Sequence, residues 1–121
     1  MRHSTGKPTK EEEARIIASK EGECVACIVR SRQGKLPPYY IVDTGCDYNH
    51  TKSGNKRRGH MFGYALCLWH HRRQVSGDWT HEMYSRIYGP SLMDGSRLFH
   101  EAYGSDDYLI DLQTRVINGD V

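Results

Sequence analysis

The sequence predicts an α+β fold in which two short strands and several short helices surround a small core. Residues 39–42 are rich in aromatic and β-branched side chains and are a predicted strand, and residues 64–68 are a second predicted short strand. Predicted helical segments, most of them opened by a capping residue, lie before and after these strands. A chain of 121 residues fits one domain. Because only 37% of the residues are hydrophobic, we expect the core to be supplemented by a disulfide or a structural metal.

The N-terminal half predicts one helix and one strand. Residues 1–8 are polar and are expected to form a flexible arm. Thr9 and Glu12 have the spacing of a capping box, which predicts a helix from Lys10 to about Lys20 that ends at Gly22. Residues 31–38 contain Gly and Pro breakers and are predicted to be a loop before the strand at 39–42. The Gly-rich, basic stretch at 44–63 shows no regular periodicity.

The second half predicts a strand at 64–68, a helix from Leu68 to about Gln74 and three further helices. Asp78, Ser96 and Ser105 are candidate N-caps of the last three, which are expected to end near Tyr88, at Gly104 and near residue 118. This acidic, helical extension, residues 78–118, is typical of packing rather than of chemistry.

The cysteine and histidine spacing carries the chemical signal. Cys24 and Cys27 form a C-x-x-C pair, and Cys67 and His70 form a C-x-x-H pair 40 residues later. Three thiolates and one imidazole are a closed tetrahedral ligand set for structural zinc. The alternatives for the cysteine pair are buried apolar thiols or a redox motif. A redox pair is the weaker of these because the sequence has no βαβ pattern around it.

His71 is not among the four predicted zinc ligands. Adjacent helical residues point about 100° apart, so His71 is expected to face away from zinc, across the helix toward His50. Two histidines meeting in a basic cleft could hold a divalent cation and activate water, as phosphodiester hydrolysis requires. Cys46 is either a spare ligand or, as we expect, a buried thiol.

Charge is unevenly distributed along the chain. Residues 24–75 contain nine Lys/Arg and two Asp/Glu, whereas residues 76–121 contain three and eight. A basic centre suggests a polyanionic partner, although a solvated surface is the alternative. The basic residues that flank the two histidines are expected to contact DNA phosphates without reading sequence; they are Lys52, Lys56, Arg57, Arg58, Arg72 and Arg73.

The sequence also predicts where in the cell the protein acts. No stretch is apolar enough for a membrane span, and the N-terminal residues lack the apolar core of a signal peptide. Together with cysteines spaced as metal ligands, this predicts a cytoplasmic protein, within the host cell if it is phage-encoded.

The motif order resembles a known enzyme family. A C-x-x-C pair, a strand ending in Asn49-His50, a loop and Leu-Cys-x-x-His-His resemble the HNH endonucleases of the ββα-metal (His-Me finger) superfamily. More narrowly, the chain is similar to phage recombination-enhancement (Ref) nucleases, which depend on RecA. The resemblance implies one HNH nuclease domain over 9–121, with its ββα-metal core at about 39–75. It also implies DNA as substrate and, as partner, a recombinase filament.

The resemblance assigns roles to individual residues. His50 would be the general base, His71 a ligand of a catalytic Mg²⁺ or similar ion, and His60 a brace of the loop or a further contributor to the metal site. The family has Asp or His where this chain has Asn49, whose amide oxygen is an uncharged ligand. Asp47 lies on the same strand face in extended geometry and could substitute for it.

The sequence is compatible with three functions. The first is a metal-dependent endonuclease of low sequence specificity, since no base-reading helix stands out. The second is a catalytically weak, zinc-stabilised DNA-binding module. The third is a recombination adaptor that docks through the acidic helices.

Overall fold

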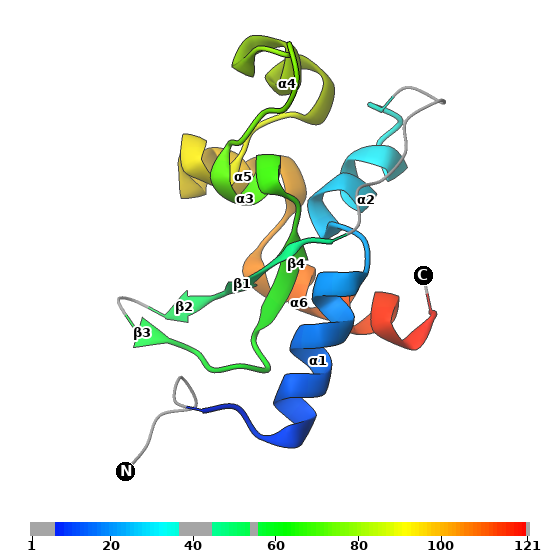
Figure 1. Ribbon diagram of the computed structural model, residues 1–121, viewed down its shortest axis with the longest axis vertical. Coiled ribbons are helices and arrows are strands. Elements are labelled where there is room, and N and C mark those ends of the chain that lie inside the picture. The colour runs from blue at the N-terminus through cyan, green and yellow to red at the C-terminus, as the bar shows by residue number, and fades with distance from the viewer. Residues whose placement is uncertain (1–6, 37–44, 54–55, 121) are drawn as a thin grey trace.

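The computed structural model describes residues 7–36, 45–53 and 56–120. Within these ranges it contains six α-helices, one 3₁₀ helix and two small antiparallel sheets, arranged as in Figure 1. The predicted α+β class is therefore confirmed. The strand predicted at 39–42 and residues 1–6 of the predicted arm lie outside the described residues.

The first helix, α1 (Lys10–Glu21), begins and ends as the sequence predicts. The Thr9 hydroxyl accepts from the Glu12 amide and the Glu12 carboxylate accepts from the Thr9 amide, which completes the capping box. Arg15 lies on the inner face of α1 and is 8% exposed. Its guanidinium donates to the Tyr48 hydroxyl and to the carbonyls of Gly63 and Ile110. Helix α1 is therefore hydrogen-bonded both to the central sheet and to the C-terminal helix.

The sequence did not predict helix α2 (Val25–Arg32). Its first five residues are all buried, so it has no polar face from which amphipathic periodicity could be recognised. Cys24 is its N-cap residue and Cys27 lies in its first turn. The helix therefore fixes the geometry of the C-x-x-C pair.

The central sheet pairs β1 (Asp47–His50) with β4 (Gly63–Leu66) in antiparallel register. The predicted second strand is thus present but ends at Leu66, because Cys67 already serves as the N-cap of α3 (Leu68–Arg72). The second sheet pairs β2 (Lys52–Ser53) with β3 (Lys56–Arg57) in a stretch that showed no periodicity. This ribbon lies at the end of the molecule away from α2 (Figure 1).

Helix α3 begins where predicted but ends at Arg72 rather than near Gln74. Arg73 adopts a left-handed conformation with φ 58°, which terminates the helix. The helix is therefore a short one that follows β4 directly and contains the histidine pair, His70 and His71.

The C-terminal segment is helical, with differences in detail. It contains α4 (His81–Tyr88), a 3₁₀ helix η1 (Leu92–Asp94), α5 (Ser96–Tyr103) and α6 (Asp106–Asn118). Thr80 caps α4 where Asp78 was predicted, because its hydroxyl accepts from the amide of Met83. Gly95 precedes α5 with no side-chain cap, so the predicted Ser96 cap is wrong. Ser105 caps α6 as predicted.

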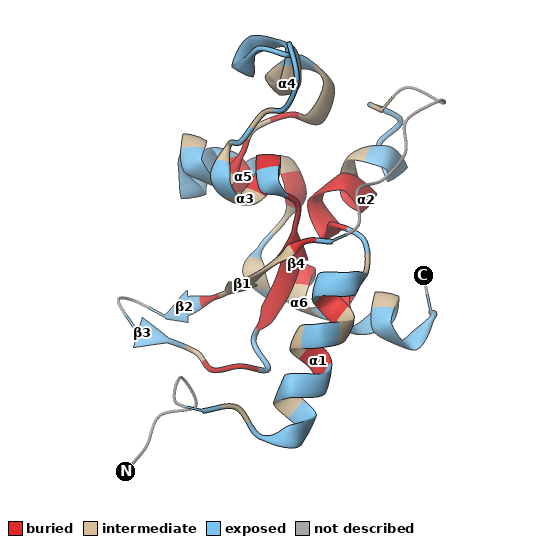
Figure 2. Cartoon of the chain, viewed as in Figure 1, coloured by how far each residue is buried: buried red, intermediate tan, exposed pale blue. Residues whose placement is uncertain are grey.

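The core lies between β4, the start of α2 and helices α3, α5 and α6, as the buried colouring in Figure 2 shows. All four residues of β4 are buried. Helix α6 supplies a hydrogen-bond partner for the backbone of β4, because the Gln113 side-chain oxygen accepts from the Ala65 amide at 2.7 Å. The C-terminal helices therefore complete the domain around the strand that leads into α3.

Candidate functional site

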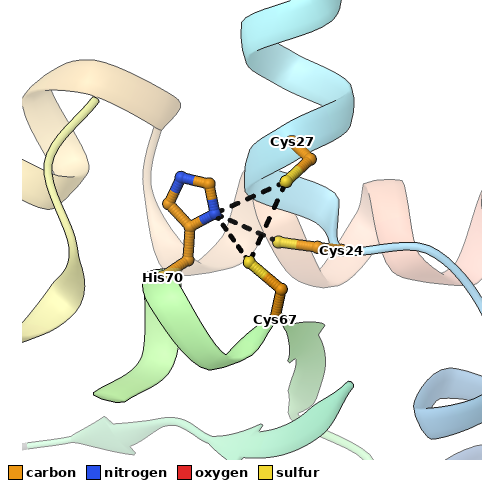
Figure 3. A group of neighbouring side chains, drawn as sticks. All are labelled: Cys24, Cys27, Cys67 and His70. Atoms are coloured by element: carbon orange, nitrogen blue, oxygen red, sulfur yellow. Dashed lines mark hydrogen bonds between the residues drawn. The ribbon is translucent and has the colours of Figure 1, made fainter. Parts of the chain in front are cut away.

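The predicted zinc ligands lie together in the structure. Cys24 and Cys27 come from the start of α2, and Cys67 and His70 come from the start of α3, with their ligand atoms within 4.8 Å of one another. Figure 3 shows the three sulfurs and the imidazole converging on one point. All four residues are buried. The predicted four-residue cluster is confirmed as a group that could hold a metal ion.

The spacing of these atoms fits tetrahedral zinc. With typical Zn–S and Zn–N lengths, a tetrahedron has edges of about 3.8 Å between sulfurs and about 3.6 Å from sulfur to nitrogen. The Cys27 and Cys67 sulfurs are 4.0 Å apart. His70 Nδ1 lies 3.5, 3.5 and 3.2 Å from the sulfurs of Cys24, Cys27 and Cys67. A closed Cys₃His set leaves no position for substrate, which indicates a structural role.

Hydrogen bonds orient the His70 ring for this purpose. Its Nε2 lies 2.9 Å from the Tyr88 carbonyl oxygen, which can only accept, so Nε2 carries the proton. The Nδ1 lone pair is then available to a metal. The buried Tyr103 hydroxyl lies 3.0 Å from Nε2 and donates to the carbonyls of Tyr88 and Pro90. Such outer partners raise ligand basicity and fix the tautomer.

Within the cluster, the pKa values of Cys24 and Cys67 are shifted in opposite directions. Burial, together with the neighbouring thiols of Cys27 and Cys67, raises the pKa of Cys24 well above its usual value. Hydrogen bonds from Cys24 and Cys27, with a contribution from His70, lower the pKa of Cys67. Burying several thiolates against one another is unfavourable without a compensating cation, which is the electrostatic condition that Zn²⁺ satisfies.

Cys46 does not join the cluster. It is 3% exposed, and its thiol donates to the Gly22 carbonyl oxygen at 3.6 Å. Among the described residues, the four zinc-type ligands are the one group of three or more His, Cys, Asp or Glu side chains that could hold a metal. Cys46 is therefore a buried thiol, as expected.

His71 faces β1 but contacts a different residue from the one expected. Its Nδ1 lies 2.8 Å from Asp47 Oδ2, and Arg72 Nε lies 2.7 Å from the same oxygen. No contact between His71 and His50 is found in the described part of the chain. Asp47 and His50 are three residues apart on a strand, so their side chains point to opposite faces.

His50 instead contacts His60. The two rings meet through His50 Nε2 and His60 Nδ1 at 2.9 Å. His60 is 5% exposed, and its backbone carbonyl accepts from the Tyr48 hydroxyl at 2.6 Å. Partial burial, followed by the charge of Arg57 and by His60, lowers the pKa of His50 below 6.5. The imidazole of His50 is therefore neutral at pH 7 and can accept a proton.

Asn49 lies on the other face of β1 from His50 and opposite Tyr64 of β4. Its side-chain amide lies within hydrogen-bonding reach of the Tyr64 phenol. The candidate residues on the Asp47 face of β1 are thus Asp47, Asn49 and, from α3, His71.

The six basic residues expected to contact DNA fall into two classes. Arg58, Arg72 and Arg73 form ion pairs with Asp107, Asp47 and Asp94 at 2.8, 2.7 and 2.7 Å. The remaining three are exposed on the β2–β3 ribbon, without an acidic partner in the described residues; we call them the ribbon cations, Lys52, Lys56 and Arg57.

Sequence reasoning missed the residues that support the site from a distance. Tyr103 and Asp106 come from the helical segment that was assigned to packing, and Tyr64 comes from the second predicted strand. The Tyr103 hydroxyl lies beside His70, and the Tyr64 hydroxyl donates to Asp106. A buried tyrosine with a polar neighbour has no signature in the sequence, because the contacts span 33 and 42 residues.

The comparisons with known proteins give one match. A family model described as "Recombination enhancement, RecA-dependent nuclease" matches residues 8–118, which include every candidate site residue. No curated protein and no solved structure matches the chain. In the described residues, no helix combines the length and apolar character needed to cross a bilayer.

Proposed function

Since the chain belongs to the family of RecA-dependent recombination-enhancement nucleases, we propose that it is a metal-dependent HNH endonuclease of the ββα-metal type. It would hydrolyse DNA phosphodiester bonds with low sequence specificity. The observation that carries this proposal is that two histidines beside β1, one on each face of the strand, are each oriented by a hydrogen-bond partner. His71 on α3 is held by Asp47, and His50 at the end of β1 is held by His60. A general base and a cation ligand are the two groups that such hydrolysis requires.

The zinc cluster supports the His71 site structurally. Because His70 and His71 are adjacent on a short helix, fixing His70 among the three thiols fixes the direction of His71. Zinc bound by Cys24, Cys27, Cys67 and His70 would therefore hold α3 against α2 and leave His71 facing β1. It would take no direct part in hydrolysis, since all four of its positions are filled.

His71 is suited to bind a catalytic cation through Nε2. Its Nδ1 proton is donated to Asp47, so the Nε2 lone pair points away from that carboxylate. A carboxylate behind a ligating histidine is the usual orienting arrangement. Asp47 also accepts from Arg72, which engages both of its oxygens, so Asp47 orients His71 and Asn49 remains the oxygen ligand. When bound, Mg²⁺ or a similar ion supplies positive charge that stabilises the leaving oxygen.

His50 acts as the general base. If His50 Nε2–H donates to His60 Nδ1, the lone pair on His50 Nδ1 is left to take a proton from water. The lowered pKa of His50 keeps that lone pair available at neutral pH. His60 is then a positioning residue, because it holds the ring through a buried contact and does not touch the reacting atoms.

The ribbon cations supply the contact with the DNA backbone. They carry three positive charges that are not neutralised by neighbouring carboxylates in the described residues. The ion-paired Arg58, Arg72 and Arg73 would have to exchange a carboxylate for a phosphate, which reduces their contribution. Contacts of this kind are sequence-independent. We place the reaction in the cytoplasm, on DNA carrying a recombinase filament.

The experiment that tests this function is a cleavage assay on supercoiled, linear and single-stranded DNA. Each substrate is incubated with and without Mg²⁺ and with and without a RecA filament. Cleavage that requires both Mg²⁺ and the filament is the expected result. Salt-sensitive DNA binding with no cleavage in any condition would instead favour the catalytically weak binding module. Binding to the RecA filament, with neither DNA binding nor DNA cleavage by the protein alone, would favour the adaptor.

A further inference from the structure

Tyr64 is a buried tyrosine whose hydroxyl the proposed function does not use. It is 1% exposed and lies in β4, directly opposite Asn49 of β1. Residues opposite each other in an antiparallel pair share one face of the sheet. The phenol therefore lies on the face that also carries the candidate cation ligand.

The hydrogen bonds of Tyr64 determine how the Asn49 amide is turned. The phenol donates to Asp106 Oδ1 at 2.6 Å, and an ionised carboxylate can only accept. The one phenolic proton is thus used, so toward Asn49 the phenol oxygen can only accept. Only the NH₂ group of Asn49 can donate to it. The amide oxygen of Asn49 is consequently the end that remains for a cation.

This chain of contacts is anchored at both ends. Asp106 is in the first turn of α6, and its Oδ1 also lies 3.4 Å from His100 Nε2. Helix α6 is bound along β4 through Gln113. Helix α6 therefore fixes the Asp106 carboxylate beside the Tyr64 hydroxyl.

We propose that Tyr64 and Asp106 are positioning residues that hold the Asn49 amide with its oxygen toward the catalytic cation. This inference rests on the proposed function, since it assumes a cation between Asn49 and His71. It also gives a physical reason for an amide at position 49. An aspartate there could not donate to Tyr64, and its charge would face that of Asp106.

The test compares Tyr64→Phe, which removes only the hydroxyl, with Tyr108→Phe, which makes the same change at an exposed position of α6. Two quantities are measured for each: the Mg²⁺ concentration giving half-maximal nicking, and the affinity of the DNA-free protein for Mn²⁺ by electron paramagnetic resonance. Loss of an outer-shell partner typically weakens metal binding about 10-fold or more. Tyr64→Phe should show this loss in both measurements, with the rate at saturating Mg²⁺ changed less.

A second pair of variants guards against a merely structural effect. Asp106→Ala removes the acceptor, whereas Asp106→Asn keeps an oxygen that can accept from Tyr64, so the alanine variant should lose more Mg²⁺ affinity than the asparagine variant. Adding Tyr64→Phe to Asn49→Ala should cause no further loss, because the amide that it positions is already gone.

The outcomes separate this inference from the function beneath it. If Tyr64→Phe and Asp106→Ala keep the parent Mg²⁺ and Mn²⁺ values while His71→Ala loses them, the positioning role is wrong and the proposed function stands. If His71→Ala also keeps the parent values, or the parent binds no Mn²⁺, the cation site itself is wrong.

Discussion

Removal of the metal from the Cys₃His cluster should unfold the domain. The four ligands join the start of α2 to the start of α3, across a separation of 40 to 46 residues. Structural zinc contributes about 10–16 kcal/mol of apparent binding free energy in small zinc domains. Globular domains have a total stability of about 0.05–0.15 kcal/mol per residue, which for 121 residues is about 6–18 kcal/mol. The metal is therefore expected to supply most of the free energy of folding.

The assay measures zinc content and folding in the same sample. Elemental analysis of the purified protein should give one zinc per molecule. Adding a strong chelator should remove it and abolish the cooperative thermal transition followed by circular dichroism, and added zinc should restore the transition. A thermal transition that is unchanged after complete zinc removal would refute this reasoning.

A matched pair of variants assigns the effect to the cluster. Cys24→Ser changes a ligand, whereas Cys46→Ser changes a buried thiol outside the cluster whose hydroxyl replacement can still donate to Gly22. We expect Cys24→Ser to lose zinc and folding. Cys46→Ser should retain one zinc per molecule, with only a modest fall in the melting temperature.

Three further predictions concern the surroundings of the site. Gly89→Ala should lower the free energy of unfolding by about 1–3 kcal/mol in urea titration, because residue 89 has φ 78° and a Cβ there would lie 2.7 Å from the Tyr103 hydroxyl; an unchanged midpoint would contradict this. The acidic limb of the cleavage-rate profile should fall below pH 6.5, because a lowered pKa keeps His50 neutral and basic to lower pH; a limb above that value would exclude His50 as the base. Replacing all three ribbon cations by Gln should reduce the slope of log K against log salt by about 2.7 if each contacts one duplex phosphate; an unaltered slope would place the DNA elsewhere.

The parts of the structure that follow from local rules could be predicted from the sequence. Thr9 and Glu12 predict α1 through their capping geometry, and Ser105 predicts the start of α6. The spacing of the C-x-x-C and C-x-x-H pairs predicts the metal cluster, because each pair can present two ligand atoms to one point and the two pairs together complete a tetrahedron. In each case the relevant residues lie within one turn or form a known ligand pattern.

The partners of the remaining site residues could not be predicted. His71 was expected to face His50, but its partner Asp47 depends on where β1 begins and therefore on which residues share a face. The chain from Asn49 through Tyr64 to Asp106 depends on α6 packing against β4, which no local pattern records. Helix α2 was missed because it is buried on all sides at its start.

The most direct test of the central claim is the nicking rate of His50→Ala beside that of the parent, with Mg²⁺ and a RecA filament present. His50 is partly exposed, so the variant should keep its zinc, its thermal transition and its affinity for DNA. Loss of a general base typically lowers the rate about 10²–10⁴-fold, and we expect a fall in this range. A His50→Ala protein that cuts DNA as fast as the parent would contradict the proposed mechanism.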